Sequence, residues 1–281
     1  MKYIFNSIFS KAYWRYILSL EGLKSILAIF GIIWLIVETL DFFQVYTKDK
    51  YASFAFFIFL LLSVLISIFL KRPIKSILLS FPEYDFIIEV RIADLFDLSG
   101  ATMISTNTIF EADVASGKIA VDSLQGQFTA KYYTGNQIEL MKKIQEELNL
   151  INSTSPYPIG TTISINTHGK TFYFNAMSEL GEGGNAQSSI PQIQDALIGL
   201  WSYVKNKGEL IELVVPVIGT GRGRVQISRK KMIALIADSF VKASIQGKFS
   251  DKLIIAVRPQ DAQNFGINLY DIKDHLNHVL K

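Results

Sequence analysis

The sequence contains no cysteine and only three histidines, and its charges almost cancel, with 28 Lys and Arg against 25 Asp and Glu. The lack of cysteine excludes disulfide bonds and thiolate-ligated metals, and it is compatible with a cytoplasmic compartment. A formal net charge of +3 gives no strong basic field, so we expect no nucleic acid among the partners.

The scarcity of histidine also limits catalysis, because general acid–base chemistry uses a positioned His or carboxylate. His275 and His278 share an expected C-terminal helix with Asp271 and Asp274, where a solvated helix face is favoured over a zinc site. His168 is expected in a turn. We therefore assign no catalytic residue, metal or cofactor, and we expect a binding protein rather than an enzyme.

What the sequence does contain is two long apolar runs near its start, Ser25–Val45 and Tyr51–Leu70. A helix that crosses a hydrocarbon core of ~30 Å needs roughly 20 apolar residues. The second run carries no charge, and Glu38 and Asp41 lie near the far end of the first, where the interface reduces the cost of burying a charge. The pattern predicts a transmembrane hairpin over residues 25–71.

Two other interpretations of these runs are less favoured. A buried hairpin in a soluble protein rarely needs helices that are apolar around their whole circumference. A cleaved signal peptide does not fit a run that starts late and is followed at once by a second. The outer flanks are basic, which places them and the soluble domain on the cytoplasmic side of a multi-pass inner-membrane protein. These flanking residues are Lys2, Lys11, Arg15, Lys24, Lys71, Arg72 and Lys75.

Residues 1–24 form a separate segment in which apolar side chains recur at helical spacing. They are Phe5, Phe9, Ala12, Tyr16 and Leu20. Two alternatives stay open for this segment. It is an amphipathic helix in the headgroup region, or it is a helix that packs on the spans or on the soluble domain.

A connector over residues 72–84 leads to a soluble domain over 85–281, in which strand and helix signals alternate. Such alternation predicts an α/β/α sandwich, a mixed sheet between two helix layers. The expected strands are 85–95, 102–106, 161–166, 171–176, 210–218 and 253–257, and the expected helices are 137–150, 193–204, 228–244 and 269–280.

The most informative local motif is the glycine-rich turn at the end of the strand around Val214, which a helix follows. Backbone N–H groups converge on an anion in such a turn, and the helix dipole adds positive potential. Arg222 and Arg224 could reinforce that charge. The alternative is a glycine turn needed only for tight packing. A Rossmann fingerprint is excluded because Asp238 falls within an expected helix, and a Walker A loop because a strand follows Gly169.

The order of motifs resembles that of a macro domain, an α/β/α sandwich that binds ADP-ribose. The motifs are RIADLF with Asp94, MISTN ending at Asn107, the stretch around Gly117, and VIGTGRG. The resemblance implies that Asp94 contacts the adenine amino group and Asn107 the distal ribose. It also implies that two loops cradle the diphosphate, one around Gly117 and the other formed by Gly219, Thr220, Gly221, Arg222 and Gly223.

Two departures from the macro pattern concern the first half of that site. Ala93 replaces the usual glycine before the Asp, and the first loop, SGKIAVDSLQGQF, lacks consecutive glycines. These differences put ADP-ribosyl hydrolysis in doubt and imply a modified distal pocket, with Ser123, Gln125 or Gln127 facing it.

Two spans followed by this variant domain resemble the membrane-type effectors of the bacterial Thoeris antiphage system (ThsA, transmembrane–macro form). The resemblance implies that a partner TIR-domain enzyme consumes NAD on infection and releases an ADP-ribose derivative. The macro domain senses this signal, and the effector assembles as a homo-oligomer and disrupts the lipid membrane. The alternatives are a membrane-anchored ADP-ribosyl hydrolase and a passive ADP-ribose-binding scaffold.

Overall fold

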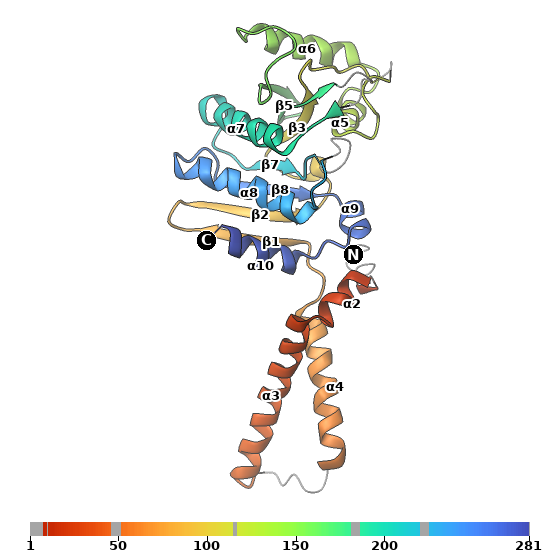
Figure 1. Ribbon diagram of the computed structural model, residues 1–281, viewed down its shortest axis with the longest axis vertical. Helices are drawn as coiled ribbons and strands as arrows, with labels where there is room; N and C mark the ends of the chain where they lie inside the picture. The colour runs from red at the N-terminus through yellow and green to blue at the C-terminus, as the bar shows by residue number, and fades with distance from the viewer. Residues whose placement is uncertain are drawn as a thin grey trace. The chain divides into compact units, whose positions relative to one another are not determined.

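The computed structural model describes residues 8–9, 11–45, 52–114, 117–180, 186–219 and 225–280 (Figure 1). The chain divides into two compact units. The first comprises Met1–Lys75 and Gln260–Leu269, and the second comprises Ser76–Pro259 and Tyr270–Lys281. We describe each unit by itself.

The first unit is built on a helical hairpin, with α3 over Leu20–Phe42 and α4 over Ala52–Leu70. Within the described residues, α3 is the one helix long and apolar enough to cross a membrane, and the apolar stretch counted for α4, Phe54–Leu70, is shorter. The short helices α2 (Lys11–Ile17) and α9 (Pro259–Asn264) complete this part of the chain. A membrane span over α3 agrees with the first predicted run.

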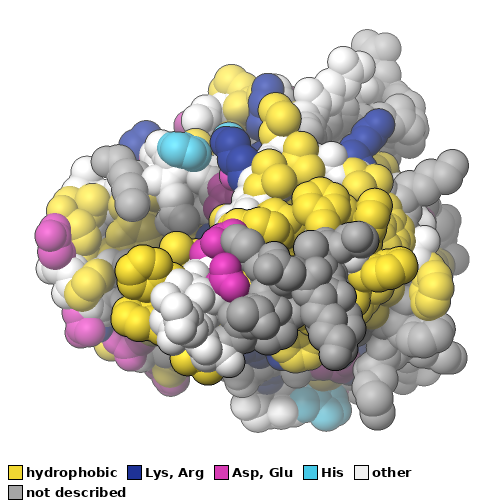
Figure 2. Space-filling model, turned by 90° about the horizontal axis from the view of Figure 1, so that it is seen from below, with side chains coloured by type: hydrophobic (Ala, Val, Ile, Leu, Met, Phe, Trp, Pro, Cys, Tyr) yellow, Lys and Arg dark blue, Asp and Glu magenta, His cyan; other side chains and the backbone are white. Residues whose placement is uncertain are grey.

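The two long helices contact each other through aromatic rings and leave their outer surfaces apolar. The ring centroids of Phe30 and Phe56 lie 5.5 Å apart, and those of Trp34 and Phe59 lie 6.5 Å apart. On the outside, Leu35 is 66% and Phe57 is 67% exposed, and Figure 2 shows hydrophobic side chains gathered on this face. Only 11% of the most apolar stretch of α3 is buried, which is less than a core helix of a soluble domain buries.

Helix α2 packs on the hairpin, which is one of the two alternatives expected for the leading segment. Tyr13 and Ile17 are buried, and the Tyr13 hydroxyl donates to the carbonyl of Ile68 at 3.2 Å. Phe9 and Trp14 remain exposed beside it. Helix α2 therefore has Tyr13 and Ile17 on the spans, and Trp14 turned outward.

The second unit contains a mixed sheet, as predicted, with the strand order β1-β2-β8-β7-β3-β5-β4 and β6 paired to β5. The five inner strands β2, β8, β7, β3 and β5 are parallel to one another. The edge strand β1 pairs with β2 antiparallel, and the edge strand β4 pairs with β5 antiparallel. The bounds are β1 Ser76–Phe81, β2 Phe86–Ile92, β3 Ala101–Asn107, β4 Thr162–Thr167, β5 Lys170–Leu180, β6 Ala186–Gln187, β7 Leu213–Pro216 and β8 Lys252–Val257.

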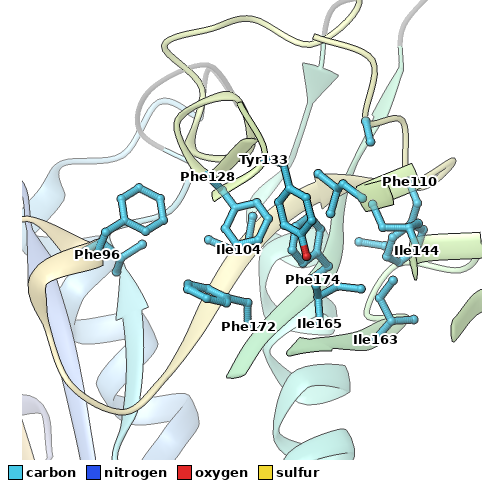
Figure 3. Packing of buried hydrophobic residues seen from close by; sticks show 14 of the residues in the cluster. Phe96, Ile104, Phe110, Phe128, Tyr133, Ile144, Ile163, Ile165, Phe172 and Phe174 are labelled. Carbon is cyan, nitrogen blue, oxygen red and sulfur yellow. The ribbon is translucent and has the colours of Figure 1, made fainter. Parts of the chain in front are cut away.

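Helices cover both faces of the sheet, so the α/β/α sandwich is confirmed. One face carries the turn η2 (Leu95–Asp97), α5 (Leu124–Tyr132) and α6 (Gln137–Asn149), and Figure 3 shows Phe128 of α5 beside Phe172 and Phe174 of β5. The ring centroid of Phe128 lies 4.8 Å from that of Phe172. The other face carries α7 (Ile190–Lys207) and α8 (Arg229–Ile245), and a Lys230–Asp271 ion pair joins α8 to α10 (Leu269–Val279).

Several elements differ from the sequence expectations. The expected strand 85–95 ends at Ile92 and is followed by η2, and β6 and α9 were not expected. Three further differences concern β1, α5 and β7. The expected connector 72–84 contains β1, whose Ile77 and Leu79 are buried against the rest of the domain. Helix α5 occupies a stretch that the sequence pattern assigned to a loop. Strand β7 is shorter than expected, because Leu210 is exposed and lies before the pairing begins.

Candidate ligand-binding site at the carboxyl edge of the sheet

The predicted site residues come from the carboxyl ends of parallel strands. Asp94 follows β2, Asn107 is the last residue of β3, and Gly219 follows β7. Because β2, β8, β7 and β3 are consecutive in the sheet, these ends meet along one edge, where open α/β sheets bind their ligands. Backbone hydrogen bonds from Ala93 to Val257 (3.0 Å) and from Val217 to Ala256 (3.2 Å) tie the strand ends together.

Asp94 is the N-cap of η2, and its side chain is exposed. Its Oδ1 accepts a hydrogen bond from the Phe96 backbone N–H at 2.9 Å. The carboxylate is therefore held by one of its oxygens, and the other oxygen can accept a hydrogen bond from a ligand. This geometry is compatible with the expected contact to an adenine amino group, which stays a prediction.

Asn107 is buried at the end of β3 and organises the loop that follows it. Its Oδ1 accepts from the backbone N–H of Ile109 at 3.2 Å and of Glu111 at 3.1 Å. Since two loop amides use this oxygen, a contact from Asn107 to a ligand would come from the Nδ2 donor. The expected contact to the distal ribose stays a prediction, and it would use Asn107 as a hydrogen-bond donor.

Glu111 holds the same loop from inside, a role that the sequence pattern did not indicate. Its Oε1 accepts from the backbone N–H of Ala112 and Asp113, both at 3.1 Å, and its Oε2 lies 3.2 Å from Lys118 Nζ. The carboxylate thus occupies two backbone N–H groups of this loop. In a glycine-rich loop such N–H groups can instead bind an anion. An acidic residue between apolar neighbours is the one sequence signal that could have pointed to it.

Gln125 joins this loop to β3 and to helix α5. Buried in the first turn of α5, it donates from Nε2 to the Glu111 carbonyl at 2.6 Å and accepts from the Thr106 hydroxyl at 3.0 Å. Both ends of its amide are therefore used within the domain. The network of Asn107, Glu111 and Gln125 ties residues 107–113, just after β3, to the first turn of α5.

The other polar residues expected at a distal pocket have local partners. Ser123 is the N-cap of α5, because its Oγ accepts from the Gly126 N–H at 3.0 Å. Gln127 donates from Nε2 to the Asp122 carbonyl at 2.8 Å. Their assignment to a ligand stays a prediction, and the structure places both at the start of the helix that follows the loop.

The two expected diphosphate loops contain glycines with left-handed backbones. Gly117 has φ +79°, and Gly219 has φ +72°. A Cβ on Gly219 would lie 2.4 Å from Ile193 Cδ1, whereas a Cβ on Gly117 would meet open space. The Val225 N–H donates to the Gly219 carbonyl at 3.0 Å and closes the neck of the second loop. Thr220, Gly221, Arg222 and Gly223 of that loop lie outside the described residues.

A buried ionic group lies within the sheet, between the middle of β2 and the first residue of β8. Glu89 of β2 is 1% exposed and contacts Arg91 and, at 2.7 Å, Lys252 Nζ. Burial raises the pKa of Glu89, but hydrogen bonds and charge from Arg91 and Lys252 outweigh it and hold the pKa below the ordinary value. Glu89 is therefore ionised at neutral pH and stabilises the fold rather than acting as an acid.

Comparison with known proteins agrees with this architecture. The family described as Thoeris protein ThsA, Macro domain, matches residues 88–258. The Thoeris protein ThsA of Bacillus amyloliquefaciens (strain Y2) is 21% identical over 204 residues, which cover 66% of this chain and 67% of that protein.

Solved macrodomains have the same fold. The Oceanobacillus iheyensis macrodomain with ADP superposes with a TM-score of 0.50 at 12% identity, covering 73% of this chain and 96% of that one. A mutant of that macrodomain gives a TM-score of 0.50 at 12% identity, covering 74% of this chain and 98% of that one. The resemblance drawn from the strand-end motifs is thereby confirmed, and since the family match spans more than half of the sequence, this chain belongs to the Thoeris ThsA macro-domain family.

Proposed function

We propose that this protein is a membrane effector of antiphage defence whose macro domain senses an ADP-ribose-derived signal. A partner TIR-domain enzyme makes the signal from NAD, and the ligand-bound effector assembles and disrupts the inner membrane. The observation that carries the proposal is the combination, in one chain, of the family's macro fold with a hairpin whose outer surface is apolar.

The ligand class follows from the carboxyl edge of the sheet. Asp94 offers a carboxylate oxygen to an exocyclic amino group, and the left-handed Gly117 and Gly219 belong to the two stretches that the macro pattern assigns to the phosphates. The Oceanobacillus macrodomain of the same fold was solved with ADP, which supports an adenine nucleotide at this edge.

The membrane location follows from the hairpin. Each Leu, Ile, Phe or Val at the centre of a bilayer contributes about −0.3 to −0.6 kcal/mol to insertion, and the 19 residues of α4 are mostly of these types and include no charge. The Ser63 hydroxyl donates to the Phe59 carbonyl at 2.6 Å and the Thr39 hydroxyl to the Leu35 carbonyl at 2.7 Å. Such bonds to the preceding turn satisfy hydroxyl groups in lipid.

Activation requires that the ligand favours one state strongly. A shift from about 1:99 to 99:1 needs ~10⁴-fold tighter binding to the active state. New contacts between neighbouring copies would supply that difference, so we propose ligand-driven oligomerisation. Mass photometry of the full chain in detergent, with and without ADP-ribose, tests this step, and an unchanged mass argues against it.

The experiment that tests the ligand class is calorimetry on the full chain in lipid nanodiscs. We expect ADP-ribose and ADP to bind and ribose 5-phosphate, which lacks adenine, to bind more weakly. If none of these compounds binds, the proposal fails. Release of free ADP-ribose from an ADP-ribosylated peptide at the rate of a true hydrolase would instead favour the membrane-anchored enzyme.

A further inference from the structure

The end of the hairpin where α3 begins and α4 ends carries four basic side chains that the proposed function leaves without a role. We call them the basic collar, and they are Arg15 of α2, Lys24 of α3, and Lys71 and Arg72 just after α4. Arg15, Lys24 and Arg72 are exposed, and Lys71 is half-buried.

Contacts with neighbouring groups hold three of the four collar cations, Lys24, Lys71 and Arg72. Lys71 Nζ lies 5.0 Å from the centroid of the Tyr16 ring and donates to the Glu21 carbonyl at 3.2 Å. Lys24 Nζ lies 2.9 Å from the Glu21 carboxylate. The Arg72 guanidinium lies 5.3 Å from the Phe69 ring. These contacts include one carboxylate against four cations, so within the described residues the group keeps an excess of positive charge.

Helix α2 fixes the position of this group. Besides the Tyr13–Ile68 hydrogen bond, Ile17 is 1% exposed against the hairpin. The corner between α2 and α3 is tight, because a Cβ on Gly22 would lie 1.9 Å from the Ile17 carbonyl oxygen. The backbone that carries Arg15 and Lys24 is therefore held in place before any ligand arrives, which reduces the entropy lost on binding.

Exposed apolar side chains adjoin the collar. Phe9 is 72%, Leu18 75% and Leu20 77% exposed, and the indole of Trp14 is 39% exposed. Tryptophan and tyrosine concentrate where hydrocarbon meets water, and apolar residues beside Lys and Arg are typical of helices that lie in the headgroup layer. The neighbourhood of the collar therefore has the composition of a lipid interface.

We propose that the basic collar binds the phosphate groups of anionic phospholipids. The inference rests on the proposed insertion of the hairpin and adds the lipid class that the inserted protein selects. Its warrant is charge complementarity, because fixed Lys and Arg donors match a phosphate diester that is flanked by apolar chains. The bound lipid would sit at the segment that leads from α4 into β1, through which the macro domain is attached.

Spin-label spectroscopy of the full chain in phosphatidylcholine vesicles tests this. Trace spin-labelled phosphatidylglycerol or spin-labelled phosphatidylcholine reports the lipid immobilised by the protein. We expect phosphatidylglycerol to associate about three-fold or more strongly, and we expect high salt to reduce the preference. The variant R15Q/K24Q/K71Q/R72Q should associate with both lipids equally.

A matched control removes the same charge from helices of the macro domain, and it should keep the full preference. It carries Lys142→Gln, Lys205→Gln, Lys242→Gln and Lys273→Gln. Equal association of the two lipids with the unaltered protein overturns the inference, and so does a preference that survives in the collar variant. Release of the chain from vesicles by carbonate would overturn the membrane proposal as well, which separates the two failures.

Discussion

The hydroxyl of Thr106, the second-last residue of β3, donates a 3.0 Å hydrogen bond to the side-chain carbonyl of Gln125 on α5. Both side chains are buried. Since Gln125 also donates to the Glu111 carbonyl, one amide connects a strand, a loop and a helix beside the proposed ligand edge. The shape of the first loop therefore depends on a residue that needs no contact with the ligand.

Replacing Gln125 by Ala should loosen that loop. It leaves the Glu111 carbonyl and the Thr106 hydroxyl without their partner, and an unsatisfied buried group costs about 1–3 kcal/mol. Hydrogen–deuterium exchange should show faster exchange over residues 108–123. Gln127→Ala on the same helix is the control and should change little, because its exposed side chain donates to the nearby Asp122 carbonyl. Equal exchange in both variants would contradict the role of Gln125.

Asp94→Asn should weaken binding of adenine nucleotides without disturbing the turn. The Asn side chain keeps an oxygen that can cap the Phe96 N–H but loses the negative charge, and a hydrogen bond to a charged group is worth about 1.5–3 kcal/mol. We expect calorimetry to show roughly ten-fold weaker binding of ADP-ribose. Asp97→Asn, which removes an exposed charge 3.3 Å from Lys131, should bind as the unaltered protein does. Unchanged affinity in Asp94→Asn would mean that the adenine group does not contact Asp94.

The two left-handed glycines should respond differently to alanine. Gly219→Ala adds a clash with Ile193 to the backbone strain, while Gly117→Ala meets open space and pays only the strain, which is about 1–2 kcal/mol. We expect the larger loss of thermal stability and of ADP-ribose affinity in Gly219→Ala. A reversed order in the thermal midpoints would mean that Gly219 does not pack against Ile193 as described.

The sequence pattern predicted the elements whose capping residues and apolar spacing lie within their own residues. Ser228 does cap α8, accepting from the Lys231 N–H at 3.3 Å, and the apolar stripe of α7 is buried as its spacing indicated. Strand β1 could not be foreseen in this way, because it depends on pairing with β2. Helix α5 has Gly126 in its interior, and its stability comes from the Ser123 cap and from packing of Phe128 on β5.

For the candidate site, the resemblance to a macro domain located strand ends that the sheet does bring to one edge. It could not supply the Glu111–Gln125 network, because that network depends on contacts between residues distant in sequence and on the local path of the loop. Hydrogen bonds of Ser123, Gln125 and Gln127 likewise depend on α5, which the sequence pattern did not reveal.

Acid should destabilise the macro domain partly through Glu89. Its folded pKa is lowered, so its contribution to stability is complete above the unfolded value of about 4.3 and is lost as pH falls through the folded pKa. Glu89→Gln should lower the thermal midpoint at pH 7, because Arg91 and Lys252 each lose a charged partner, and should flatten the decline below pH ~4. Glu146→Gln on the exposed face of α6 is the control, and an unaltered acid slope in Glu89→Gln would place the sensitivity elsewhere.

Charges placed on the outer surface of α4 should separate membrane action from ligand binding. Phe57 and Leu61 are 67% and 61% exposed, and a Lys at mid-membrane costs about 2.5–3.5 kcal/mol, so Phe57→Lys with Leu61→Lys should prevent stable insertion of α4. In cells that carry the partner TIR-domain enzyme, dye uptake after infection should disappear. Phe57→Leu with Leu61→Ile keeps the surface apolar and should retain dye uptake. Calorimetry should give the same ADP-ribose affinity for both variants, because the macro fold does not include α4.

Dye uptake that persists in the double Lys variant would mean that the hairpin does not act on the membrane.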